Sequence, residues 1–88
     1  MPYFVRTILV TGSEAEVGPA RREHLSHLAD LAAAGKIRAA GAFARGDGYL
    51  EIFEARDLFE AEEIARESPL VILGLGTWML REWEELPL

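Results

Sequence analysis

The sequence predicts an α+β fold with the element order β-α-β-β-α-β, the ferredoxin-like arrangement. In this fold a four-stranded antiparallel sheet carries both helices on one face. Three observations support the prediction. Apolar runs suited to strands occur near both ends and in the middle of the chain. Helical apolar spacing fills the two intervals between them. A turn signal at Gly46-Asp47-Gly48 joins the two middle strands as a hairpin.

The first strand is expected within Pro2–Thr11. Its apolar residues fall on both faces, with Tyr3, Val5 and Leu9 on one and Phe4, Ile8 and Val10 on the other. The segment GSEAEVG that follows is interpreted as a loop. Pro19 suits the first turn of a helix that should end near Gly35.

The two middle strands are expected at Ile37–Ala44 and Tyr49–Phe53. Asp57 is a suitable N-cap for a second helix from Leu58 to about Glu67, because its carboxylate accepts the free amide hydrogens of the first turn. Ser68-Pro69 interrupts that helix, and the next residues can form one short helical turn.

The fourth strand is expected in TWMLREWEEL, where Trp78, Leu80 and Glu82 alternate with Met79, Arg81 and Trp83. A helix is the main alternative for this segment, because Glu, Leu and Met favour helices. A strand is preferred, since a third helix would leave the sheet one strand short.

Composition limits the function. The chain has 88 residues, half of them hydrophobic, and is expected to form one domain over residues 1–88. It has no cysteine, which excludes disulfides, thiolate metal sites and cysteine nucleophiles. A net charge of −6 with scattered basic residues argues against nucleic-acid binding. No signal peptide or membrane-spanning run is recognised, so a cytoplasmic location without membrane attachment is expected.

The sheet face away from the helices should be polar if water covers it. Here the first strand is apolar on both faces and the fourth places a tryptophan on each. Apolar residues gathered on one face usually meet a partner. We therefore expect a symmetric homodimer that packs sheet on sheet.

The helix in PARREHLSHLADLAAAGK contains two histidines among its leucines. With Leu28 at the centre of the buried face, Arg21 and His24 both point inward near the N-terminal end. An arginine, a histidine and free helix amides form a plausible pocket for a small acidic ligand. His27 falls at the edge of the stripe and is assigned no function, and no metal or cofactor is expected.

The order Arg21-x-x-His24-Leu25, Gly35-Lys36-Ile37 and Ala40-Gly41-Ala42-Phe43 resembles the YciI-like (YCII-related) family of small dimeric α+β barrel proteins. The resemblance covers nearly the whole chain, as one domain. It implies a sheet-to-sheet dimer and a pocket with a proposed catalytic histidine–aspartate pair. The family typically has Asp-Pro-Tyr or Asp-Pro-Phe where this chain has Ser68-Pro69-Leu70.

Carried over by position, the resemblance implies catalytic roles for His24, Arg21 and the Ser68 position. Tyr3, Gly41 and Phe43 are the expected substrate contacts. Ser68 supplies no charge, so another carboxylate must replace the aspartate, with Glu82 or Asp47 as candidates, unless the protein binds without turnover.

Two functions follow. In the first, the protein is a cofactor-independent enzyme of the dehydrochlorinase, isomerase or lyase kind, with His24 as general base and Arg21 holding the anionic group of an acidic or phenolic ligand. A cofactor-free monooxygenase is a related hypothesis, which only analogy of fold supports and which we place after the first. In the second, the protein is a non-catalytic binding or accessory dimer. A dimerisation module with a vestigial pocket is a third reading.

Overall fold

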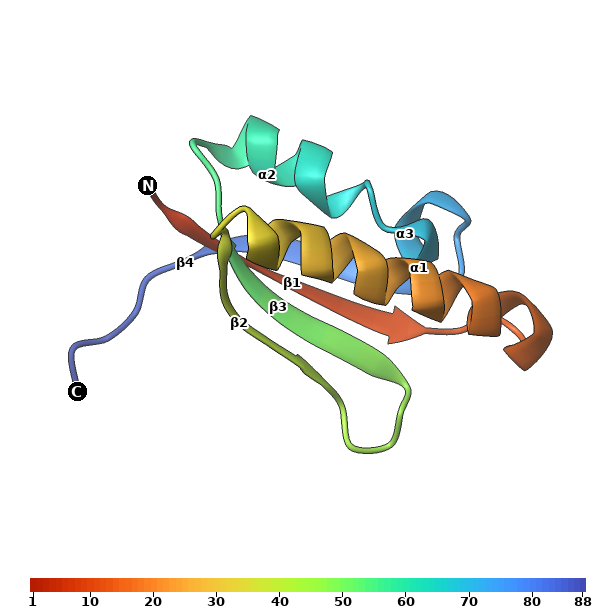
Figure 1. Ribbon diagram of the computed structural model, residues 1–88. Helices are drawn as coiled ribbons and strands as arrows, with labels where there is room; N and C mark the ends of the chain where they lie inside the picture. The colour runs from red at the N-terminus through yellow and green to blue at the C-terminus, as the bar shows by residue number, and fades with distance from the viewer.

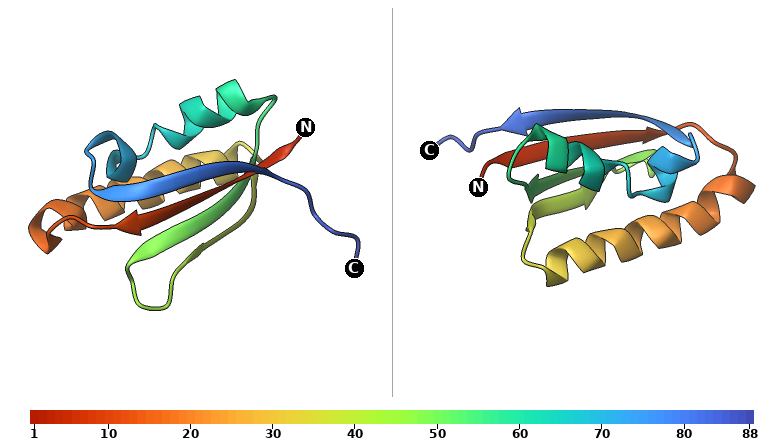
Figure 2. Two further views of the ribbon diagram at one scale, coloured as in Figure 1. Left: turned by 180° about the vertical axis from the view of Figure 1, so that it is seen from behind. Right: turned by 90° about the horizontal axis from the view of Figure 1, so that it is seen from above.

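The computed structural model describes residues 1–88 and confirms the α+β fold (Figure 1). Its elements are β1 Tyr3–Val10, α1 Glu14–Ala33, β2 Ile37–Ala42, β3 Gly48–Glu54, α2 Leu58–Ala65, α3 Pro69–Ile72 and β4 Gly76–Trp83. The four strands form one antiparallel sheet in the order β2-β3-β1-β4. All helices lie on one side of this sheet, as the right-hand view of Figure 2 shows. None of them combines the length and apolar character needed to cross a membrane.

The C-terminal segment is a strand, and the helical alternative is wrong. β4 pairs with the whole of β1, from Tyr3 opposite Trp83 to Val10 opposite Gly76. Trp78 lies opposite Ile8 and so faces the helices. Alternate side chains of this segment face the helices and the open face of the sheet. This two-residue period is that of a strand and not that of a helix.

The first helix begins earlier than the sequence prediction placed it. α1 starts at Glu14, so most of the expected GSEAEVG loop is helical and Pro19 lies inside the helix. Ser13 is the N-cap: its hydroxyl accepts the backbone hydrogen bond of Glu16 and donates to the Glu16 carboxylate at 2.9 Å. This Ser-x-x-Glu capping box was present in the sequence and was overlooked.

The remaining boundaries differ by a few residues. β2 ends at Ala42 and α2 at Ala65, both earlier than predicted. The short helical turn after Ser68-Pro69 is confirmed as α3, with Ser68 as its N-cap. α3 is followed by Gly74, whose φ of 64° is readily adopted only by glycine.

The hydrophobic core lies between the sheet and the helices, in two clusters. One contains Phe4 and Phe53 and the other contains Ile8 and Tyr49. Between them, on the same strands and the same face, Arg6 of β1 lies directly opposite Glu51 of β3, and both are fully buried. A charged layer therefore divides the core.

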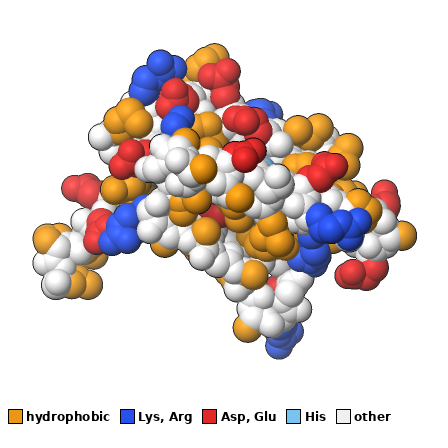
Figure 3. All heavy atoms as spheres, viewed as in Figure 1, with side chains coloured by type: hydrophobic (Ala, Val, Ile, Leu, Met, Phe, Trp, Pro, Cys, Tyr) orange, Lys and Arg blue, Asp and Glu red, His pale blue; other side chains and the backbone are white.

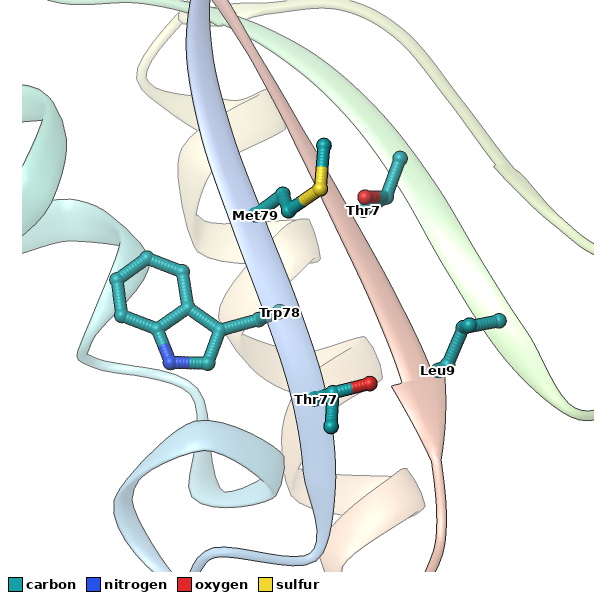
Figure 4. Close-up of a pocket in the computed structure, with 5 residues that line it drawn as sticks. All are labelled: Thr7, Leu9, Thr77, Trp78 and Met79. Carbon is teal, nitrogen blue, oxygen red and sulfur yellow. The ribbon is translucent and has the colours of Figure 1, made fainter.

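The other face of the sheet has no covering layer within the chain. Thr7, Leu9, Thr77 and Met79 project from it, while Trp78 projects toward the helices (Figure 4). These residues line a shallow hollow of about 180 Å³. Leu9 and Met79 are 49% and 58% exposed, so this face remains apolar and open in a single chain.

Candidate functional site

The charged layer is built around Glu51. One carboxylate oxygen, Oε1, accepts from Nε of Arg6 at 2.7 Å, and the other, Oε2, lies 3.0 Å from Nε2 of His24. All three side chains are fully buried. The strand register places Arg6 opposite Glu51. His24 extends from the buried face of α1 toward this pair.

The second ring nitrogen of His24, Nδ1, lies 2.7 Å from the hydroxyl of Ser68. A carboxylate can only accept, so in the neutral imidazole Nε2 carries the hydrogen and Nδ1 accepts from Ser68. Ser68, His24 and Glu51 thus form a serine–histidine–carboxylate line, an arrangement the sequence analysis did not anticipate. Ser68 is fully buried and its oxygen also accepts from the amide of Leu70 at 3.2 Å, so it is not presented as a nucleophile.

Glu51 is the carboxylate that pairs with His24, and the two candidates named from the sequence were wrong. Glu82 and Asp47 are exposed and neither contacts His24. Burial raises the pKa of the Glu51 carboxyl, but the hydrogen bond from His24 and the charge of Arg6 outweigh burial and lower it. Glu51 is therefore a buried anion at neutral pH.

His27 also belongs to this cluster, although the sequence analysis assigned it no function. Its Nε2 lies 3.3 Å from Nη1 of Arg6, which also donates to the carbonyl of Ala65 at 2.9 Å. Burial and the neighbouring Arg6 charge lower the pKa of His27 to about 4. His27 is thus neutral at physiological pH and accepts a hydrogen bond from the guanidinium.

Sequence reasoning missed Arg6 and Glu51. Each of these residues is the single charge inside an apolar strand segment, and this pattern could have identified them. Arg6 lies in YFVRTILV and Glu51 in YLEIF. A charge at a core-facing position is rare unless it is paired. Two such residues of opposite sign in neighbouring strands could have been matched with each other.

Arg21 is partly buried and does not join the buried cluster. Its guanidinium donates to the hydroxyl of Tyr49 at 3.0 Å and to the carbonyl of Gly46 at 2.6 Å. Tyr49 in turn packs against His24, with 4.6 Å between the ring centroids. Arg21 therefore reaches His24 only through the Tyr49 ring.

α1 is rotated about its axis relative to the sequence prediction. This rotation explains why Arg21 does not join His24 in the buried cluster. The residues of α1 that are buried in the core are Val17, Ala20, His24 and Leu31. Leu28, which was expected at the centre of the buried face, is only partly buried, and Leu25 is 55% exposed. Leu25 and Leu28 lie on a stripe beside the core-facing one and line a groove with the edge strand β2. Arg21, on the same stripe, contacts Tyr49 of β3.

The expected substrate contacts are dispersed. Gly41 lies beside Tyr49 in a groove between α1 and β2. Phe43 follows β2, with its ring next to Gly48 in the hairpin. Tyr3 lies at the far end of β1 on the open face, where its ring meets Trp83 edge-on at 6.0 Å. Within one chain, Tyr3 does not reach the His24 cluster.

Comparison with known proteins adds to this geometry. The sequence model of the YCII-related domain matches residues 1–84. No curated protein matches the chain. A similar solved structure is the 5-chloro-2-hydroxyhydroquinone dehydrochlorinase of Burkholderia phenoliruptrix AC1100 in complex with 2,5-dihydroxybenzoquinone. It is 22% identical, 93% of each chain is covered, and the TM-score is 0.75, so the two share a fold.

Replacing the central carboxylate should destabilise the fold strongly. The substitution Glu51→Gln leaves Arg6 buried without a counter-charge, and breaking a buried pair in this way costs about 3–5 kcal/mol. Urea unfolding followed by circular dichroism measures the loss. Glu85→Gln, at the exposed partner of Arg38, is the matched control and should change the free energy of unfolding little. Equal effects of the two substitutions would contradict the charged layer described here.

Acid should destabilise the protein through His27. A lowered folded pKa means that the unfolded chain binds more protons between pH 6.5 and about 4. The stability contributed by neutral His27 is complete above pH 6.5 and is lost as the pH falls toward 4. Glu51 adds to this loss only below its ordinary pKa of 4.5.

The variant His27→Gln should show a smaller loss of stability than the native protein across that window. Urea unfolding at successive pH values gives the comparison, and NMR titration of the His27 ring gives its pKa directly. A midpoint near 6.5 would refute the burial of His27 against Arg6.

Proposed function

The chain belongs to the YCII-related domain family, and from that membership we propose that it is a cofactor-independent small-molecule enzyme of the dehydrochlorinase, isomerase or lyase kind. The observation that carries the proposal is the buried His24–Glu51 pair, stabilised by Arg6. A carboxylate beside an imidazole fixes its tautomer and stabilises the imidazolium that proton transfer creates.

In this proposal His24 is the general base, acting at Nδ1. Nε2 is committed to Glu51, so Nδ1 carries the lone pair that can receive a proton. The Ser68 hydroxyl occupies that lone pair at 2.7 Å. A substrate proton can reach Nδ1 by either of two routes. In one, the Ser68 hydroxyl gives its own proton to His24 as it accepts the proton of the substrate. In the other, the hydroxyl rotates away and Nδ1 takes the substrate proton directly.

Arg21 is proposed to hold the anionic group of the substrate. No carboxylate lies within ion-pair distance of its guanidinium, whose two partners are a phenol hydroxyl and a backbone carbonyl. It therefore keeps an uncompensated positive charge. An acidic or phenolic ligand supplies the complementary one.

The alternative is a binding or accessory protein without turnover. One observation favours it: His24 and Ser68 are fully buried, and neither lines a pocket in this structure. Catalysis thus requires a side chain to move aside, whereas binding at Arg21 does not.

The two functions separate in an assay of variants. The chlorinated hydroxyhydroquinone named for the similar dehydrochlorinase is the first substrate to test, followed by other phenols and small carboxylates. His24→Gln should lower kcat about 100-fold or more and leave ligand affinity largely unchanged, because general acid–base catalysis is typically worth this much. Ser26→Ala, at an exposed position of the same helix, is the control and should keep most activity. Binding without turnover in the native protein would establish the alternative.

We further propose that the protein, as a single domain over residues 1–88, is a homodimer packed through the open sheet face. The apolar residues of that face, among them Val5, Leu9 and Met79, have no partner within the chain. A second copy would cover them with an identical surface, the usual form of a two-fold interface. In such a dimer each copy places Tyr3 and Trp83 at the interface, away from its own His24.

Charge introduced on this face should dissociate the dimer. Light scattering at micromolar concentration should give twice the mass of the chain for the native protein, and the mass of one chain for Met79→Arg. Phe59→Arg places the same charge at a 72% exposed position on α2 and should leave the dimer intact. A native protein that is monomeric would refute the assembly.

A further inference from the structure

One stripe of α1 beside the core is only partly covered by the rest of the chain. Arg21, Leu25 and Leu28 are spaced at i, i+4 and i+7, so they line one side of the helix. β2 is an edge strand of the sheet, and a groove lies between it and α1. Leu25 consequently remains 55% exposed, although such a side chain in a well-formed core would be buried.

A groove lies along this stripe. Leu25 and Leu28 of α1 form one wall, β2 residues Ala40–Ala42 form the other, and Tyr49 of β3 completes it. Figure 3 shows hydrophobic side chains gathered along this side of α1, above the β2–β3 hairpin. The volume is about 200 Å³. An apolar cavity of about 150 Å³ is large enough to bind benzene, so the groove accommodates one six-membered ring.

A positive charge lies beside Tyr49, one of the residues that line the groove. Arg21 donates to the hydroxyl of Tyr49 at 3.0 Å and lies over the tyrosine ring, 5.7 Å from its centroid. Its second donor bond goes to the carbonyl of Gly46, and it has no carboxylate partner. In a chain with a net charge of −6, this is a guanidinium left free to attract an anion beside an apolar surface.

We propose that the groove between α1 and β2 binds a single flat ring that carries a carboxylate or an acidic hydroxyl. The ring lies between Leu25 and Leu28 on one side and Ala40–Ala42 on the other. The acidic group points to Arg21. Small side chains on β2 are required for this, because larger ones would fill the space that the ring occupies.

Tyr49 connects this groove to the buried cluster. Its ring lines the groove and also packs on His24 at 4.6 Å between centroids. A ligand in the groove is therefore separated from His24 by one aromatic side chain. This link to His24 rests on the proposed function, whereas the groove itself stands on its lining and its charge.

Benzoate is the probe that tests the groove. NMR titration of the native protein should shift the methyl signals of Leu25 and Leu28. Ala40→Leu fills the groove from an exposed position and should weaken benzoate binding at least tenfold. Arg21→Gln removes the charge and should weaken it about tenfold, the typical value of a hydrogen bond to a charged group.

Ala33→Leu is the matched control, because it makes the same substitution on the solvent side of α1 and should leave affinity unchanged. Benzoate that fails to shift Leu25 and Leu28, or that binds Ala40→Leu as well as it binds the native protein, would overturn the proposal. Failure of the proposed function has a different signature. There, benzoate binds in the groove but no substrate is turned over, or His24→Gln retains full activity. Turnover that survives Ala40→Leu unchanged would leave His24 as the base and exclude the groove as its substrate site.

Discussion

The pairing of Arg6 with Glu51 across β1 and β3 determines how the interior of this protein is arranged. A lone carboxylate at that depth would lose several kcal/mol of hydration, and a guanidinium there would lose a comparable amount. Together they are tolerated because Nε of Arg6 meets Oε1 at 2.7 Å and the other oxygen is satisfied by His24. The apolar residues are left to form two separate clusters on either side.

α1 serves two surfaces at once. One stripe places His24 in the charged layer. The neighbouring stripe places Leu25 and Leu28 beside the edge strand β2, and Arg21 against Tyr49 of β3. The proposed base and the proposed anion-binding residue therefore lie less than one turn apart along the helix, on adjacent stripes of its surface. Tyr49 is the element that joins them, since it bonds to Arg21 and packs on His24.

Ser68 and Glu51 lie on opposite sides of the His24 imidazole. In the resemblance noted from the sequence, an aspartate occupies position 68. Here Ser68 meets Nδ1, and the negative charge comes from Glu51 in the sheet at Nε2. His24 thus has a carboxylate partner at Nε2, and the lone pair on its Nδ1 points to the Ser68 hydroxyl. Glu51 is also shared with Arg6, so one carboxylate serves both the guanidinium and the imidazole.

Sequence patterns by themselves determined the element order, the antiparallel sheet and the inward position of His24. These depend on local periods: alternation in β1 and β4, helical spacing in α1, and the turn at Gly46-Asp47-Gly48. A capping box at Ser13 was equally local and could have corrected the start of α1. The resemblance also identified the family.

Only the tertiary structure decided which residues surround His24. Glu51 is 27 residues away in sequence and Ser68 is 44 residues away, and neither separation follows from a local period. The register between β1 and β3 sets Arg6 opposite Glu51, and the rotation of α1 on the sheet places Arg21 against the Tyr49 hydroxyl beside the groove rather than in the core. The physical reason is that burying a charge requires a partner in space, and the position of that partner is fixed by how strands and helices pack, not by the order of residues along the chain.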